Sequence, residues 1–134
     1  EKWETEEKNI SESIVRYYTE NGCGVIVGKK FYNRIGITKE EGEKTEVLST
    51  RLSEEKKNIC NVEIKKLNFN LNKETTQMVK MLDIMQNCEK INLLNQKTLM
   101  RYLAYYCQLY SDEAANYVIK NKKYKWVFTL PLLF

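Results

Sequence analysis

The 134-residue chain contains no histidine, one proline and five glycines. Without histidine it cannot build Ser-His-Asp or Cys-His catalytic groups, and it lacks the commonest ligand of zinc and iron sites. Aspartate is almost as scarce, since only Asp83 and Asp112 occur, each at a position typical of a helix surface or helix cap. We therefore predict that the chain is not an enzyme and holds no metal or other cofactor.

Long apolar runs are also absent. No stretch of eighteen apolar residues occurs, so we expect no transmembrane segment. Apolar residues make up 43% of the chain and charged residues 30%, a mixture too apolar for a disordered protein. The length fits one domain. Because the chain begins with Glu1 and not with methionine, we expect residues 1–134 to be a single domain excised from a larger protein.

The few glycines do not form a phosphate-binding loop. Gly24 and Gly28 enclose three residues, whereas a P-loop needs four between its glycines and a hydroxyl residue after the lysine. Lys30 stands where that hydroxyl is required. The thirteen glutamates of residues 1–72 lie in charged stretches, and no spacing among them predicts a buried carboxylate pair.

Four cysteines stand far apart in the sequence, with no C-x-x-C pair, at Cys23, Cys60, Cys88 and Cys107. This spacing predicts free, mostly buried thiols in a reducing compartment, and hence an intracellular protein, cytoplasmic or nuclear. A secreted domain with two disulfides is the alternative. A four-thiolate zinc site would require all four separated cysteines to converge.

The first half of the chain predicts a helix followed by strands. Apolar residues between 10 and 18 recur at helical spacing, and a stop signal follows. Glycine-bounded β-branched residues and an alternating stretch then predict a β-hairpin over about 24–37. After a charged connector, residues 47–52 predict a short helix.

Residues 59–71 alternate as a long strand does, but the alternation changes phase. Val62 and Ile64 share one parity, whereas Leu67 and Phe69 share the other. A β-bulge at residues 65–66 would restore one buried face, and two short strands joined by a turn are the alternative.

The second half predicts three helices and a final strand. Asn72 is placed to cap a helix over 73–88, Leu99 lies in the stripe of a second helix, and Ser111 begins a third. A strand pattern follows over about 124–130. The whole indicates an α+β fold, with a small antiparallel sheet packed against a helical subdomain of about 73–121. We interpret the methionines Met78, Met81, Met85 and Met100 as core, the alternative being an adaptable partner groove.

The net charge of +4 belongs to the second half. Residues 1–72 carry 13 basic and 13 acidic side chains, and residues 73–134 carry 9 and 5. No acidic residue follows Glu113. The run 120–126 interleaves lysines with aromatics, which is typical of nucleic-acid binding. A solvated turn with inward-facing aromatics, an acidic protein surface and lipid headgroups remain alternative interpretations.

Tyrosines surround the second of these helices, which indicates a face that is partly buried or covered by a partner. We therefore predict a non-catalytic interaction or assembly module of a larger intracellular or viral regulatory protein, which binds a protein partner or a second copy of itself. The alternative is a nucleic-acid-binding module. The candidate binding residues are Lys120, Lys122, Lys123, Tyr124, Lys125, Trp126, Tyr102 and Tyr105.

The nucleic-acid alternative predicts measurable binding at low salt. Replacing Lys122, Lys123 and Lys125 with alanine should then flatten the dependence of affinity on salt, by about one unit of slope for each lost phosphate contact. Fluorescence anisotropy with single- and double-stranded oligonucleotides measures both quantities. Undetectable binding of the unchanged chain at low salt would exclude this alternative.

Overall fold

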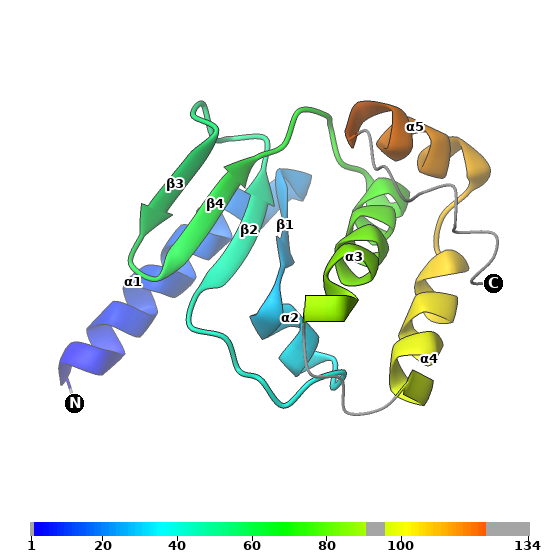
Figure 1. Ribbon diagram of the computed structural model, residues 1–134. Helices are drawn as coiled ribbons and strands as arrows, with labels where there is room; N and C mark the ends of the chain where they lie inside the picture. The colour runs from blue at the N-terminus through cyan, green and yellow to red at the C-terminus, as the bar shows by residue number, and fades with distance from the viewer. Residues whose placement is uncertain (1, 91–95, 123–134) are drawn as a thin grey trace.

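The computed structural model describes residues 2–90 and 96–122, and these form three layers (Figure 1). Helix α1 covers one face of a four-stranded sheet, and most of the remaining helices lie on its other side. The predicted α+β class is confirmed. The helices are α1 (Lys2–Thr19), α2 (Lys29–Arg34), α3 (Lys73–Asn87), α4 (Gln96–Cys107) and α5 (Asp112–Lys122), with short 3-10 turns at Glu20–Gly22 and Cys88–Lys90.

The sheet has the order β1-β2-β4-β3 and is mixed rather than purely antiparallel. Strands β2 and β4 pair in parallel, and the other two pairs are antiparallel. A two-residue turn joins β3 to β4, with φ of 48° at Cys60 and 64° at Asn61. Positive φ at both central residues is the turn that matches strand twist. The strands are β1 (Gly24–Val27), β2 (Thr45–Ser49), β3 (Lys56–Ile59) and β4 (Val62–Lys66).

Central strand β2 is covered on both faces, and this arrangement contradicts the short helix predicted for residues 47–52. Val47 packs toward α1 with Leu52 and Ile64, whereas its neighbour Leu48 packs into the larger core with α3. Consecutive residues of a strand point to opposite faces, so a doubly covered strand can bury adjacent apolar residues, as Val47 and Leu48 do here. Such a pair does not alternate, and it resembles a helical segment in sequence.

The predicted hairpin over 24–37 is wrong in its second half. After β1 the chain forms helix α2, in which the Tyr32 N–H bonds to the Gly28 carbonyl at 3.0 Å. Gly28 has φ of 85°, and a side chain there would collide with the Glu46 carboxylate. Only glycine fits this position without strain. Phe31 and Tyr32 are both buried, although a strand would have sent them to opposite faces.

The strand predicted over 59–71 is confirmed over Val62–Lys66, where β4 lies, and is wrong beyond Lys66, where β4 ends. The change of phase marks the point where the chain crosses between the two cores, and it does not mark a bulge. Val62 and Ile64 face α1, whereas Leu67 and Phe69 lie in the core beneath α3. The strand predicted over about 124–130 lies outside the described residues.

The helical layer follows the sequence expectations closely. Asn72 caps α3, since its side chain accepts from the Thr75 N–H at 2.9 Å and the Thr75 hydroxyl accepts from the Asn72 N–H at 2.7 Å. Ser111 likewise accepts from the Ala114 N–H at 3.2 Å at the start of α5. Met78, Met81 and Met85 are buried, which confirms their assignment to the core, whereas Met100 on α4 is 40% exposed and its assignment to the core was wrong.

The capping box of α3 predicts a stability effect. Asn72→Ala removes the side-chain oxygen that accepts from the Thr75 N–H, keeps the backbone N–H bond to the Thr75 hydroxyl, and should lower the free energy of unfolding by about 1 kcal/mol. Asn70→Ala, an exposed neighbour in the same loop, should stay within about 0.5 kcal/mol of the original. Urea denaturation measures both. Equal losses in the two variants would contradict the importance of the cap.

Candidate functional site

The predicted binding residues that the structure describes do not form one site. Tyr102 is half-buried on α4, and Tyr105 on the same helix is 54% exposed. Lys120 is exposed on α5, where Lys122 is the last residue. The other predicted positions, Lys123, Tyr124, Lys125 and Trp126, lie outside the described residues, so the basic-aromatic site stays a prediction.

The tyrosines around α4 divide between core and surface. Tyr106 is buried against Phe31, with ring centroids 6.5 Å apart. Tyr110 donates from its hydroxyl to the Met81 sulfur at 3.0 Å. These two tyrosines therefore serve the fold, and Tyr105 is the one that faces solvent.

An apolar groove lies on the opposite side of the molecule, between α1 and the edge strand β3. Its volume is about 490 Å³. We call it the α1 groove and define it by Asn9, Ile10, Ser13, Ile14, Tyr17, Tyr18 and Ile59. Ile10 is 49% exposed and Tyr17 is 54% exposed, so both offer apolar area to solvent. The spacing of Ile10, Ile14 and Tyr17 was visible in the sequence, where it indicated a helix face, but nothing there showed that this face stays uncovered.

Polar bonds hold α1 in place and preform the groove. The Ser11 hydroxyl bonds to the Cys60 carbonyl at 2.5 Å, and the Ser49 hydroxyl bonds to the Tyr18 carbonyl at 2.7 Å. Arg51 donates to the Tyr17 carbonyl at 2.6 Å and to the Glu20 carboxylate at 3.0 Å, while its guanidinium lies 4.7 Å from the centre of the Tyr17 ring. The second half of α1 is therefore fixed against the sheet.

The first half of α1 extends past the sheet (Figure 1). Residues 5–10 are all exposed, whereas Ile14, Val15 and Tyr18 pack on the small core beneath the helix. A helical segment as short as this projecting half is marginal in water without packing partners. The apolar stripe of the α1 groove continues onto this projecting half through Ile10.

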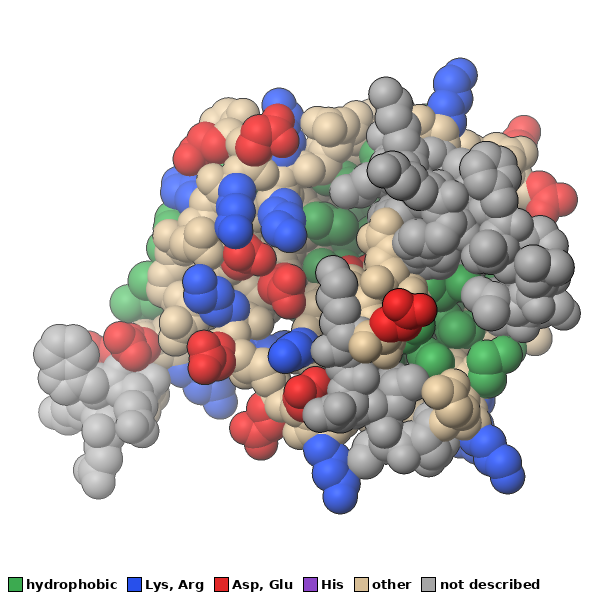
Figure 2. Space-filling view, in the orientation of Figure 1, with side chains coloured by type: hydrophobic (Ala, Val, Ile, Leu, Met, Phe, Trp, Pro, Cys, Tyr) green, Lys and Arg blue, Asp and Glu red, His purple; other side chains and the backbone are tan. Residues whose placement is uncertain are grey.

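A polar cavity of about 230 Å³ lies on the other face of the sheet, between β2, β4 and α3. Figure 2 shows acidic and basic side chains mixed over the sheet beside a hollow that faces the helical layer. Asp83 accepts from the Tyr32 hydroxyl at 2.6 Å and from the Gly28 N–H at 3.1 Å. Burial, reinforced by Asp83, raises the pKa of Tyr32 far above its ordinary value, so the phenol stays protonated and keeps donating.

Glu46 and Glu63 both line this cavity, and both carboxylates are half-buried rather than buried. Burial raises the pKa of Glu46, and the charges of Asp83 and Glu63 raise it further. Glu63 lies beside Glu46 in the parallel register of β2 and β4, where an ion pair with Lys56 at 2.9 Å lowers its pKa. This parallel pairing brings together residues far apart in sequence, so no spacing rule could have found it.

Two carboxylates of this cavity, Asp83 and Glu63, have partners within the fold. Within residues 2–90 and 96–122, no three histidine, cysteine, aspartate or glutamate side chains come together in a way that could hold a metal ion. Asp83 is bonded to Tyr32, Gly28 and Asn87, and Glu63 is paired with Lys56. Asp83, expected to be a helix-surface residue, instead joins α3 to α2.

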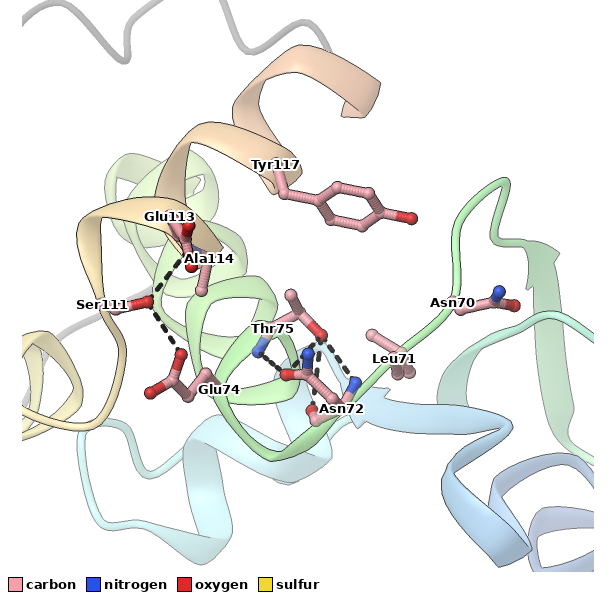
Figure 3. A pocket seen from close by; sticks show the side chains of 9 residues that line it. All are labelled: Asn70, Leu71, Asn72, Glu74, Thr75, Ser111, Glu113, Ala114 and Tyr117. Atoms are coloured by element: carbon pink, nitrogen blue, oxygen red, sulfur yellow. Dashed lines mark hydrogen bonds between the residues drawn. The ribbon is translucent and has the colours of Figure 1, made fainter.

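A third hollow of about 450 Å³ lies where the first turns of α3 and α5 meet (Figure 3). The Ser111 hydroxyl donates to the Glu74 carboxylate at 2.8 Å and links the two helix starts. Tyr117 extends over this hollow from α5 and packs edge-on against Phe69, with centroids 5.6 Å apart. Most of the polar groups that line this hollow belong to the caps of α3 and α5, so we assign the hollow to the junction between these two helices.

We compared the chain with protein-family models, curated proteins and solved structures, and none of these comparisons gave a match. In the described part of the chain, no helix combines the length and the apolar character needed to cross a bilayer. Of the three hollows described above, the α1 groove has the most apolar lining, and we take it as the candidate functional site.

The raised pKa of Glu46 predicts a pH dependence of stability. An ionised Glu46 costs the folded state free energy, so this group makes the protein more stable as pH falls through its raised pKa. Glu46→Gln keeps an acceptor for the Lys29 N–H and removes the charge. The variant should be more stable than the original at pH 7, and the difference should shrink as the pH is lowered.

Glu63→Gln is the matched control with the opposite sign. Because its pKa is lowered by Lys56, the charge of Glu63 stabilises the folded state at pH 7, and that contribution is lost as pH falls through the lowered pKa. Glu63→Gln should therefore be less stable than the original at pH 7. Urea denaturation at several pH values measures both variants, and the same sign in both would refute this assignment of charges.

Proposed function

We propose that this chain is a non-catalytic protein-interaction module and that the α1 groove is its docking surface. The observation that carries the proposal is the exposure of Ile10 and Tyr17 on a helix whose opposite side is bonded to the sheet. Exposed apolar area on a preformed surface favours association, because burying it removes that area from water without a large ordering cost.

The residue types of the groove support this function. Tyrosine is enriched among the residues that contribute most to protein interfaces, and Tyr17 has Arg51 stacked on its ring. The lining is mostly apolar and also contains the polar residues Asn9 and Ser13. Apolar and aromatic groups combined with a few polar groups are the usual composition of a specific interface.

The absence of catalytic machinery in the sequence supports a binding role over an enzymatic one. The chain has no histidine, and its best-buried carboxylates make bonds that hold the fold. All four cysteines are unpaired, with Cys60 exposed and the other three half-buried. Free thiols are typical of reducing compartments, so we propose a cytoplasmic or nuclear location.

Partner capture with matched variants tests the docking surface. Tyr17→Asp places a charge in the groove, and Tyr105→Asp places the same charge on α4 at an equal exposure of 54%. A partner of the groove should bind the original chain and the Tyr105 variant, and should bind the Tyr17 variant at least about tenfold more weakly. Direct titration of the purified partner measures the three affinities.

Two outcomes would contradict the proposal. Equal affinities for all three chains would show that the α1 groove is not the binding surface. Loss of binding in the Tyr105 variant with retention in the Tyr17 variant would move the interface to α4. Thermal melting of both variants serves as the control for folding, and since both side chains are exposed we expect small shifts.

A further inference from the structure

We infer that the partner of the α1 groove is a second copy of this chain, bound through an antiparallel pairing of the two α1 helices about a two-fold axis. This inference rests on the proposed function and names the occupant of the groove. Three features carry it: the stripe on α1, the projecting first half of the helix, and the distribution of charge along the stripe.

The stripe has the spacing of a two-helix seam. Glu7, Ile10, Ile14 and Tyr17 follow one another at intervals of three, four and three residues. This spacing keeps side chains on one face of a helix that packs along another helix. Ser11, Ile14 and Val15 contact the sheet or the small core on it, whereas Ile10 and Tyr17 are exposed and available to a second helix.

The projecting half of α1 indicates what kind of partner completes the surface. A short peptide lying between α1 and Ile59 would fill the groove as far as Asn9 and leave residues 5–8 exposed. An antiparallel α1 helix from a second copy covers both parts, because the projecting half of each copy lies along the groove of the other. The projecting half of α1 in each copy thus covers the groove of the other, and the same contact is made twice, as a two-fold interface requires.

Charge along the stripe favours the antiparallel direction. Glu6 and Glu7 lie in the projecting half, and the Arg51 guanidinium lies over Tyr17 at the far end. If Ile10 of one copy faces Ile14 of the other, Glu7 lies opposite Tyr17 and the Arg51 stacked on it. A parallel pair would instead place the acidic residues of the two copies side by side, which is unfavourable.

Sedimentation velocity over a range of protein concentrations tests the inference with the whole chain. We expect the original chain to form a dimer reversibly. Ile10→Asp and Tyr17→Asp should each weaken the dimer at least about tenfold, because a two-fold interface contains every substitution twice. Tyr105→Asp should leave the dimer unchanged, and all four chains should melt at similar temperatures.

Charge variants test the direction of pairing. Glu7→Lys places a lysine opposite Arg51 and should weaken the dimer several-fold at low salt, with a smaller effect at about 0.5 M salt. Glu12→Lys makes the same charge change on an exposed side of α1 away from the stripe. It should have little effect. Equal effects of the two substitutions would overturn the antiparallel arrangement.

A chain that stays monomeric up to about millimolar concentration would overturn the inference of a second copy. In that case the proposed function would still be tested separately, through the Tyr17-dependent binding of a different partner. A dimer that is lost in the Tyr105 variant and kept in the Tyr17 variant would also overturn it, because the interface would then lie on α4.

Discussion

The carboxylate of Asp83 joins the layers of this molecule. It accepts hydrogen bonds from the Gly28 N–H and the Tyr32 hydroxyl, and so fixes the turn between β1 and α2 to the middle of α3. Asn87, one turn further along α3, donates to the other oxygen at 3.2 Å. A partly buried carboxylate with three donors is well satisfied, whereas loss of any partner would leave a costly charge. The position of the helical layer on the sheet depends on this group.

The contacts of Asp83 on one face of the sheet also affect the opposite face, which α1 covers. Because α2 and α3 cover one side of the sheet, strand β2 can present Val47 to α1 while Leu48 stays in the larger core. Helix α1 then packs on the sheet. The Ser11 hydroxyl of α1 bonds to the Cys60 carbonyl, and the Ser49 hydroxyl of β2 bonds to the Tyr18 carbonyl near the end of α1. The exposed apolar residues Ile10 and Tyr17 of α1 line the groove beside strand β3, and a surface that is already formed in this way loses little entropy when a partner binds.

Local features of the structure were predictable from sequence, and features set by distant contacts were not. The cap at Asn72 and the methionine stripe of α3 depend on residues within a few positions of one another. Strand β2 was missed because its burial on both faces removes the alternation that marks a strand. The role of Asp83 was missed because its partners lie more than fifty residues earlier in the chain. For the candidate site, the spacing of Ile10, Ile14 and Tyr17 was readable, but its exposure depends on where α1 crosses the sheet.

Hydrogen exchange of the α1 backbone amides tests most directly whether a second copy completes this helix. Exchange reports local opening, and residues 5–10 are exposed in the single chain, so their amides should exchange rapidly in dilute protein. If two α1 helices pair, these amides should become progressively protected as protein concentration rises, while those of α3 keep the same protection throughout. Protection of α1 that does not change with concentration would contradict the account.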